Sequence, residues 1–536
     1  MSQGYPYFCV HSRPRPLTTP AAPSAAPTND RAFFGHPKGL GLLFTTEMWE
    51  RFSYYGLRPL LVLFMAAALQ QGGFGFERTQ ASAIVGIYAA SVYLASLPGG
   101  WIADRWLGLR RAILTGAVFI TAGHLAIGLS GFANASLGKI FFFLGLVLIV
   151  CGTGLLKPNI SAIVGDLYPE GGARRDAGFS IFYMGINSGS FLGQLVTGYL
   201  GEKIGYHWGF GAAGVGMAFG LLSFWIGAPK LLGTLGLDIV RDPDPVVQRK
   251  RESFVKTATF TGLGILALVF VLAASGTVTL NPLAIGGAMT VVLVSIAVAF
   301  FAYLFAFGGL SSEEKKRSAV IFVLFVFAAI FWAAFEQAPT SLQLFAKDFT
   351  ERQMFGMQIP ATWFQSVNSL FIIIFSPVFA ALWVMMAKRG LEISSPAKFA
   401  LGLAFAGGGF LIMLFAANDV VASGGKTLVS PWWLTISYLL QTFGELCVSP
   451  VGLSSMTKLA PRKYVGQMMG IWFLAASVGN LVAGLVGGRV DPTKLEQTPI
   501  VFSATAIALF VSTAILVAMI VPIRNMMAGV KDEGAV

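Results

Sequence analysis

Long apolar runs recur along the whole chain, and short polar connections separate each run from the next. A helix that crosses a bilayer needs about 20 such residues, whereas a strand of a transmembrane barrel alternates over about ten. The runs therefore predict an all-α integral membrane protein. Fourteen spans are expected, at residues 39–69, 80–103, 110–131, 138–165, 178–201, 208–229, 257–275, 281–308, 318–338, 361–387, 399–416, 430–450, 464–488 and 500–523.

The first of these runs carries four charges between apolar flanks, namely Glu47, Glu50, Arg51 and Arg58. Each would cost about 3 kcal/mol near the bilayer centre unless it pairs or meets water. On a helix they are three, four and seven residues apart and share one broad face. That face is expected to look into the protein interior or a wet cavity. A helix end whose arginines reach back to the interface is the alternative, but the apolar flanks argue against it.

Three further charges lie inside expected spans, at Lys157, Glu336 and Glu445. Together with the first four they make three basic and four acidic groups, so complete pairing leaves one carboxylate over. A surplus carboxylate can stay in apolar surroundings by taking up a proton, as a proton-coupled carrier requires. Structural ion pairs that only hold helices together are the alternative, although buried ion pairs are a poor source of stability.

The same charges can also bind a ligand with two opposite poles. Lys157 with Arg51 or Arg58 can bind a carboxylate, while Glu445 can bind an ammonium group. Further side chains that offer hydrogen bonds or apolar walls are Tyr54, Tyr55, Tyr93, Asn187, Trp332 and Trp472. Such a site suits a zwitterion. Taken singly, each of these aromatic residues more often serves packing alone.

Composition and charge distribution agree with a membrane protein. Of 536 residues, 55% are hydrophobic and 12% are charged, and the net charge of +12 lies mainly in the short connections rather than in a nucleic-acid-binding patch. With the N-terminus inside, and with Arg110, Arg111 and Lys139 at the span ends counted with the adjoining connections, 26 of the 37 Lys and Arg residues fall in the tails and inner connections, 8 fall outside, and three lie within spans. Both termini are therefore expected in the cytoplasm.

The spans divide into two groups of six with one pair between them. The expected parts are a disordered tail at 1–36, a six-helix bundle at 37–229, a cytoplasmic linker at 230–256, two inserted helices at 257–308, a second six-helix bundle at 309–525 and a C-terminal tail at 526–536. Two halves of this kind are typical of transporters, whose substrate site lies between them.

Motifs for enzymatic or nucleotide chemistry are incomplete in this sequence. Gly424-Gly-Lys-Thr427 resembles the end of a P-loop, but position 420 is Val where the first Gly belongs. Gly209-Phe-Gly-Ala-Ala-Gly214 has dinucleotide-binding spacing but opens an apolar span without a preceding strand. The three cysteines form no disulfide or metal-binding pattern. We expect no enzyme, no metal site and no cofactor, with the proton as the coupling ion.

Two stretches of the chain resemble the signatures of a known family. Glu47-x-x-Glu50-Arg51-Phe-Ser-Tyr54-Tyr55-Gly is similar to the first-helix signature of the proton-dependent oligopeptide transporters, a branch of the major facilitator superfamily. Residues 176–190 are similar to their fifth-helix signature, and residues 100–108 resemble the superfamily loop between helices 2 and 3. The similarity runs from about residue 37 to 525, and fourteen helices fit the prokaryotic members. Ser190, where many members have Ala, and the long N-terminal tail depart from the pattern.

The resemblance implies a role for each candidate residue. Proton coupling would involve Glu47, Glu50, Arg51 and Glu336. An extracellular gate would be the ion pair Arg58–Glu336, and Lys157–Glu445 would pair across the two halves. The peptide carboxylate would face Arg51 and Lys157, and the amino terminus would face Asn187, Asn368 and Glu445. Side-chain pockets would be lined by Tyr54, Tyr55, Tyr93, Trp332, Trp472 and Ser477.

The function implied is proton-coupled uptake of di- and tripeptides across the bacterial cytoplasmic membrane, by alternating access between two six-helix bundles and as a monomer. A carrier of another small anion or zwitterion, such as nitrate or an amino acid, keeps the same fold. A membrane receptor that does not transport is a further alternative, although seven charges around a wet cavity argue against it.

Overall fold

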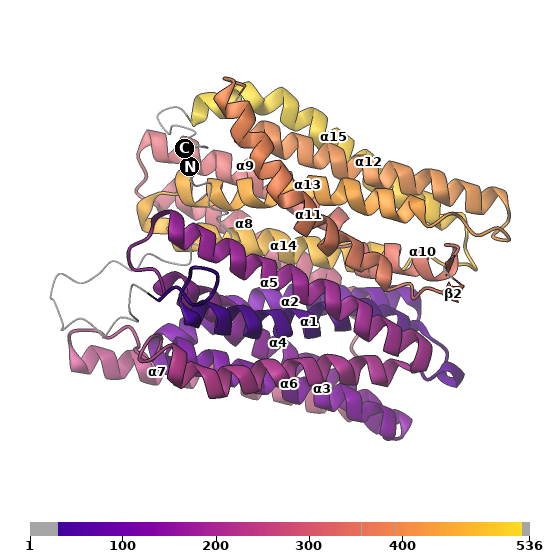
Figure 1. The fold of residues 1–536 in the computed structure, drawn as a ribbon, viewed down its shortest axis with the longest axis horizontal. Coiled ribbons are helices and arrows are strands. Elements are labelled where there is room, and N and C mark those ends of the chain that lie inside the picture. The colour runs from indigo at the N-terminus through magenta and orange to yellow at the C-terminus, as the bar shows by residue number, and fades with distance from the viewer. Residues whose placement is uncertain (1–29, 355, 392, 528–536) are drawn as a thin grey trace.

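A computed structural model describes residues 30–354, 356–391 and 393–527, so most of the two expected tails lies outside the described residues (Figure 1). The described part is almost entirely helical. Its long helices are α1 (Lys38–Ala66), α2 (Arg78–Ile102), α3 (Leu109–Leu129), α4 (Ala135–Asp166), α5 (Gly172–Tyr199), α6 (Tyr206–Leu231), α7 (Pro245–Ala274), α8 (Pro282–Phe307), α9 (Ser312–Phe335), α11 (Trp363–Lys388), α12 (Ser395–Ala422), α13 (Trp432–Leu459), α14 (Val465–Gly487) and α15 (Gln497–Met526).

The remaining elements are short. Three π-helical turns, η2 (Ala103–Leu107), η4 (Leu200–Ile204) and η5 (Ala338–Leu342), follow α2, α5 and α9. Three 3-10 turns are η1 (Leu69–Gln71), η3 (Ser130–Phe132) and η6 (Arg462–Tyr464), and α10 spans Gln343–Asp348. The strands β1 (Gln353–Met354) and β2 (Met357–Gln358) form an antiparallel hairpin.

The fourteen expected spans are confirmed as the fourteen long helices of the described chain. Eleven segments are long and apolar enough to cross a membrane by length and composition alone. The three long helices outside that set are α1, α5 and α13, each of which carries polar or charged residues along its length. These residues lower the mean hydropathy, and many of them face the cavity described below rather than lipid.

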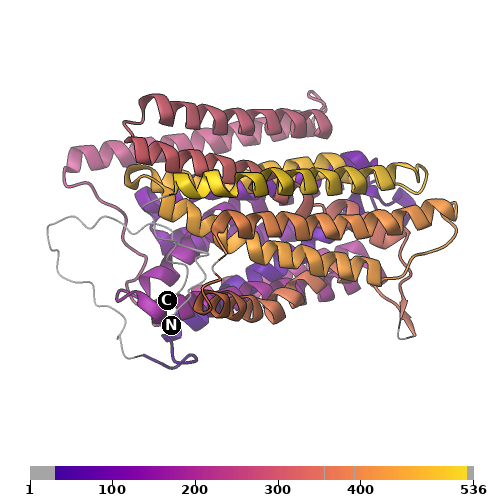
Figure 2. The same ribbon diagram turned by 90° about the horizontal axis from the view of Figure 1, so that it is seen from above.

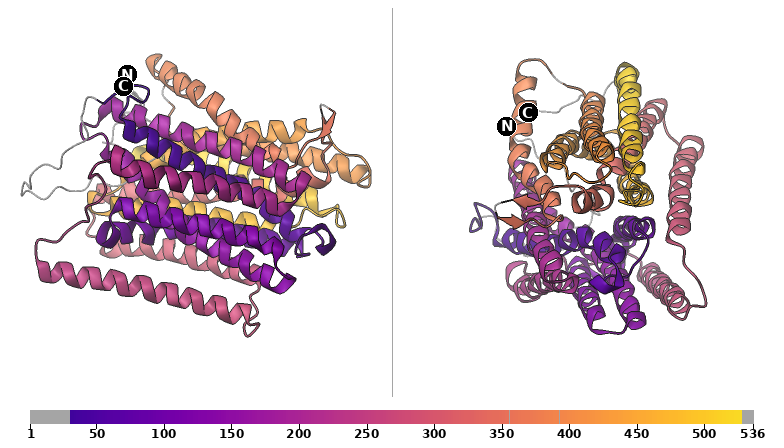
Figure 3. Two further views of the ribbon diagram at one scale, coloured as in Figure 1. Left: turned by 60° about the horizontal axis from the view of Figure 1, so that its bottom comes forward. Right: turned by 90° about the vertical axis from the view of Figure 1, so that its right-hand side faces the viewer.

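The long helices form two groups that lie side by side (Figure 3). In the first, α1 packs against α5 and α6, and α3 packs against α4. In the second, α12 packs against α13 and α15, and α9 packs against α14. We call these groups the N half (α1–α6) and the C half (α9–α15). The halves meet mainly where α2 packs on α14 and α5 packs on α11.

The pair α7 and α8 lies along the outside of the bundle (Figures 2 and 3). Val255 is the one buried residue of α7, and most other side chains of that helix are exposed. Helix α8 packs on α2 and α14, so it touches both halves. The start of α1 and the end of α15 lie at one end of the molecule, which we call the terminal end, and the β1–β2 hairpin marks the other, the hairpin end (Figure 1).

Small residues allow the closest helix contacts, as their spacing in the sequence suggests. Gly185, Gly189 and Gly193 of α5 lie against the backbone and side chains of α1, where an added Cβ would collide with neighbouring atoms. Gly484 of α14 lies so close to Gly86 of α2 that its Cβ would be 2.7 Å from the Gly86 Cα. The α5–α1 contact holds one half together, whereas the α14–α2 contact joins the two halves.

The connections differ from the sequence expectation in two places. Helix α7 begins at Pro245, inside the stretch expected to be a linker, because Asp244 caps its first turn by accepting a hydrogen bond from the Val246 amide at 2.8 Å. The chain between the expected spans 318–338 and 361–387 carries no predicted helix. Instead it continues through η5 and α10 before the hairpin, so this connection is ordered and packed.

Candidate functional site

A cavity of about 190 Å³ lies between the two halves. Helices α1, α2, α4 and α5 line it from the N half, and α9, α11, α13 and α14 line it from the C half. The sequence-predicted residues among those that line it are Glu47, Arg51, Tyr55, Arg58, Tyr93, Lys157, Asn187, Trp332, Glu336, Asn368, Glu445 and Trp472. Residues from both ends of the chain are therefore brought into one site.

The charged turn of α1 forms a compact cluster around Arg51. The Arg51 Nε lies 2.9 Å from a Glu47 carboxylate oxygen and 2.5 Å from a Glu50 carboxylate oxygen. All three side chains are at most 3% exposed, so one guanidinium balances two carboxylates away from water. Two negative charges beside a single positive one leave the cluster with one charge that a proton could neutralise.

A second buried ion pair closes the cavity nearer the hairpin end. Arg58 of α1 pairs with Glu336, the residue directly after α9, and the two side chains are 7% and 5% exposed. The Arg58 guanidinium also donates to the side-chain oxygen of Asn480 on α14 at 3.5 Å. Both contacts cross from the N half to the C half, so the structure contains the Arg58–Glu336 pair that the resemblance implied.

Lys157 and Glu445 behave differently from the other charges. Among the described residues, neither forms an ion pair within 4.0 Å, so the implied Lys157–Glu445 pair is not formed in this conformation. The Lys157 ammonium lies 4.4 Å from the centre of the Tyr93 ring instead. Glu445 accepts a hydrogen bond from the Asn368 amide at 3.3 Å. The cavity thus presents a cation from the N half and a carboxylate from the C half.

Several uncharged polar residues of the cavity were missed from the sequence. Gln194 lies seven residues after Asn187 on the same face of α5, and Gln365 precedes Asn368 by three on α11. Ser190 and Ser369 bridge the halves through their hydroxyls at 2.7 Å. The signal that could have identified them is helical spacing, since Ser190 and Gln194 follow Asn187 by three and seven residues and Gln365 precedes Asn368 by three. Ser369 directly follows Asn368 and offered no such signal.

Three uncharged residues that line the cavity carry a polar group with no hydrogen-bond partner within the described part of the chain. The groups are the indole N–H of Trp332, the side-chain oxygen of Gln194 and the hydroxyl of Ser449. Buried polar groups are normally satisfied, so a ligand or water in the cavity is the natural partner for all three. The site can therefore hydrogen-bond a guest at points between its two charged poles.

Three of the expected site residues do not line the cavity. Glu50 is fully buried behind Arg51, and Tyr54 packs against Tyr55 and Tyr88. Ser477 is fully buried, and its hydroxyl donates to the Phe473 carbonyl oxygen at 3.0 Å. The expectation that Tyr54 and Ser477 line side-chain pockets does not match this structure, because both lie one layer behind the cavity wall.

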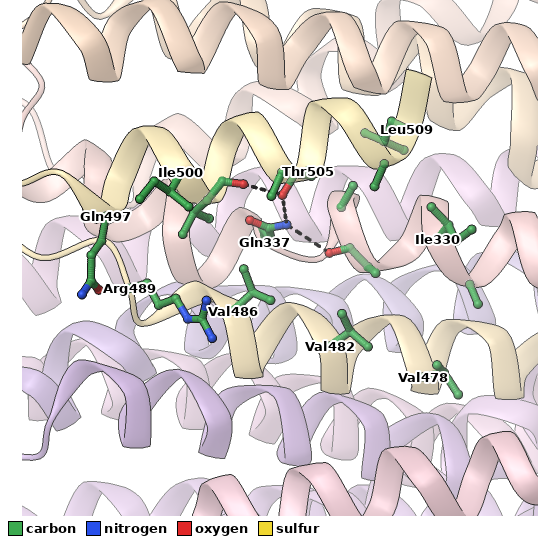
Figure 4. Close-up of a pocket in the computed structure, with 16 residues that line it drawn as sticks. Ile330, Gln337, Val478, Val482, Val486, Arg489, Gln497, Ile500, Thr505 and Leu509 are labelled. Carbon is green, nitrogen blue, oxygen red and sulfur yellow. Dashed lines mark hydrogen bonds between the residues drawn. The ribbon is translucent and has the colours of Figure 1, made fainter. Parts of the chain in front are cut away.

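A second and larger pocket, of about 640 Å³, lies among α9, α14 and α15 (Figure 4). Its walls are mostly valine, isoleucine and alanine, with Arg489 and Gln497 near one end. Gln337 donates to the Thr505 hydroxyl at 3.1 Å within it. This pocket contains a single charged side chain and belongs to the C half alone, so the smaller central cavity is the better candidate for chemistry that involves charge.

Comparison with known proteins identifies the family. The sequence model described as the POT family matches residues 110–501. The peptide transporter YePEPT of Yersinia enterocolitica is 49% identical over 507 residues, which cover 94% of this chain and 98% of the relative. The chain belongs to the POT family. A POT relative from Lactococcus lactis subsp. cremoris, a di-/tripeptide transporter, is 36% identical over 495 residues, which cover 91% of this chain and 94% of that protein.

Solved POT structures share the fold over nearly the whole length. The crystal structure of a peptide transporter POT in complex with sulfate is 40% identical, has a TM-score of 0.84, and covers 93% of this chain and 98% of that one. A POT family transporter in complex with 5-aminolevulinic acid is 33% identical, with a TM-score of 0.82 and coverage of 92% and 98%. The expected family and superfamily fold are confirmed, and proteins of this family are transporters rather than enzymes.

Proposed function

We propose that this protein is a proton-coupled symporter that takes up di- and tripeptides. The observation that carries the proposal is the pair of opposite poles in the central cavity, with Lys157 and Arg51 on the N half and Glu445 on the C half. A short peptide is a zwitterion of matching polarity. Its carboxylate would face Lys157 and Arg51, and its amino group would face Glu445, Asn368 and Asn187.

Aromatic residues of the cavity would hold the side chains of the peptide. Tyr55, Tyr93, Trp332 and Trp472 offer apolar surfaces with polar tips, which suits a site that accepts many different side chains. The groups recognised in every peptide are therefore its two termini, while the walls of the cavity accept different side chains. No cofactor takes part, and the proton is the coupling ion.

The coupling carboxylate would be Glu47, Glu50 or Glu336. Protonation of a carboxylate near Arg58 would weaken the Arg58–Glu336 pair, so that the halves part at the hairpin end and admit peptide. After release at the terminal end, Lys157 and Glu445 would pair across the halves. In the present conformation the Arg58–Glu336 pair is formed, and Lys157 and Glu445 do not pair. These two features support assigning the conformation to a state closed at the hairpin end.

The protein would work as a monomer in the cytoplasmic membrane of a bacterium, with both termini in the cytoplasm. The halves at residues 37–229 and 309–525 would rock as units around the cavity, and 257–308 would stay at the lipid-facing side. Support for this division comes from the packing of α1–α6 and of α9–α15 among themselves.

Uptake of labelled dialanine into liposomes containing the purified protein tests the function. Accumulation that needs an inward proton gradient, disappears with an uncoupler and is blocked by unlabelled tripeptide would support peptide symport. Peptide binding without gradient-driven uptake would instead indicate a receptor or an uncoupled carrier.

A second cargo class has a specific observation in its favour, since one POT relative binds 5-aminolevulinic acid, which also has an amino and a carboxyl group. Gradient-driven uptake of that compound, or of nitrate or a single amino acid, in the absence of dialanine uptake would support this alternative.

A further inference from the structure

One of the carboxylates that join the two halves at the hairpin end, outside the cavity, is Glu202. Glu202 lies in the π-helical turn η4 that follows α5, and its side chain is 2% exposed. It does not line the central cavity, so neither peptide contact nor the charged cluster of α1 accounts for it. A buried carboxylate needs partners, because removing its hydration is costly.

All the partners of Glu202 come from the other half. One carboxylate oxygen accepts the Ala361 amide at 3.0 Å, and the other accepts the Thr362 amide at 2.8 Å. These amides directly precede α11, where a helix leaves backbone N–H groups without internal partners and favours negative charge. The same carboxylate lies 3.7 Å from the Lys347 ammonium and 3.6 Å from the Arg352 guanidinium.

The contact depends on how the two halves are placed against each other. Glu202 follows α5 of the N half, while the two amides and both cations belong to the C half. Parting of the halves at the hairpin end would remove all four partners together and return the carboxylate to water. Helix α11 lies close to α5 at this end and diverges from it toward the terminal end (Figure 1). It also carries Asn368 and Ser369 to the cavity.

We propose that Glu202 is a positioning residue that clamps the N-terminus of α11 and thereby sets the population of the conformation closed at the hairpin end. The proposal rests on alternating access as the proposed function. The clamp acts separately from proton and peptide binding, because Glu202 touches neither the cavity nor Arg51. Its loss favours the conformation open at the hairpin end and leaves the peptide contacts in place.

Substitution Glu202→Gln tests the clamp. Glutamine keeps the size of the side chain but offers only one oxygen. Its amide nitrogen would face one of the two backbone N–H groups and cannot accept a hydrogen bond from it. The matched control is Glu351→Gln, an exposed carboxylate at the same end that accepts an amide hydrogen bond at 2.7 Å from Gln353, within its own half.

The readout is the distance between spin labels in reconstituted protein without substrate or gradient, after removal of the native cysteines. Labels at Phe132→Cys and Leu428→Cys report the hairpin end, and labels at Glu170→Cys and Leu391→Cys report the terminal end. All four positions are exposed. We expect Glu202→Gln to lengthen the first distance and shorten the second, with about a tenfold change in the population ratio, or ~1.4 kcal/mol.

An unchanged distribution in Glu202→Gln relative to Glu351→Gln would overturn the proposal. If Glu202→Gln does not fold, Glu202→Asp keeps the charge but shortens the side chain. A smaller shift in the same direction then supports the clamp, and no shift overturns it. In folded protein, dialanine counterflow with an unchanged KM for peptide and a changed maximal rate would separate positioning from binding. Failure of peptide transport by the unmodified protein would reject the proposed cargo while the distances still decide on the clamp.

Discussion

At the scale of single residues, the seven charges of the spans are not equivalent. Arg51 is shared by Glu47 and Glu50, Arg58 is paired with Glu336, and Lys157 and Glu445 face the cavity without an ion-pair partner in the described structure. Of the seven charges, these last two are the ones that no ion pair in the described structure neutralises. The crowded carboxylates around Arg51 are the natural place for a proton, because one guanidinium cannot compensate two negative charges.

Replacement of Glu50 by Gln removes the second carboxylate from this cluster. We expect gradient-driven peptide uptake to fall to the level of empty liposomes, since the variant cannot take up the coupled proton there. Peptide counterflow, which needs no net proton movement, is expected to persist. Loss of the charge-assisted contact to Arg51 should cost about 1–3 kcal/mol of stability.

The control for that experiment is Glu313→Gln, because the Glu313 side chain is 56% exposed and pairs only with Lys316 at the surface. It should leave both activities unchanged. Uphill transport retained in Glu50→Gln would contradict the role of Glu50 in coupling and shift attention to Glu47 and Glu336.

At the scale of elements, the site depends on how closely α5 approaches α1. Gly189 lies against Met48, the residue that follows Glu47 in the sequence, and Gly193 lies against Phe52. Without side chains at these positions, Asn187 on α5 and Arg51 on α1 can line the same wall of the cavity. The glycine ridge thus determines the width of the site as well as the packing of the half.

Gly189→Ala adds a single methyl group to this contact, which would collide with the Met48 carbonyl oxygen. We expect a loss of about 1–3 kcal/mol in stability from overpacking, visible as a lower midpoint of thermal unfolding in detergent. The control is Gly211→Ala on α6, where an added Cβ meets no atom within 4 Å. That change should be neutral or slightly stabilising. Equal unfolding midpoints for the two variants would show that the α5–α1 contact accommodates the added methyl group without loss of stability.

At the scale of the whole molecule, the ion pairs that join the halves gather toward the hairpin end. Arg58–Glu336, Arg78–Asp348 and the Glu202 contacts all lie there, and the last two are outside the cavity. The orientation of the molecule in the membrane therefore determines from which side access to the cavity is closed. The tails and inner connections contain 26 Lys and Arg residues against 8 in the outer connections. This excess predicts that the terminal end, where α1 begins and α15 ends, faces the cytoplasm.

Reporter fusions test that orientation directly. Green fluorescent protein fused after Val536 should fluoresce in intact cells, because it folds in the cytoplasm. Alkaline phosphatase inserted at Gly424, in the loop between α12 and α13, should be active, because it needs the opposite side. Each reporter placed at the other site serves as the control. An active phosphatase at Val536 would reverse the orientation and with it the direction of the proposed cycle.

The sequence by itself determined the fourteen spans and the seven charges within them, since these follow from bilayer thickness and from the cost of burying charge. Those constraints act on one helix at a time. Twelve of the expected site residues line the cavity. The sequence could not show that Tyr54 and Ser477 lie behind the cavity wall instead of lining it.

Only the tertiary structure decided how the two halves meet. Whether Lys157 pairs with Glu445, which helix N-terminus Glu202 caps, and that Ser190 meets Ser369 all depend on the placement of one half against the other. A transporter must adopt more than one such placement with the same sequence. Contacts within a half therefore follow from local pattern, while contacts between halves belong to a conformation. The Arg58–Glu336 pair was implied by the family resemblance, and the other contacts between the halves were recognised only in the structure.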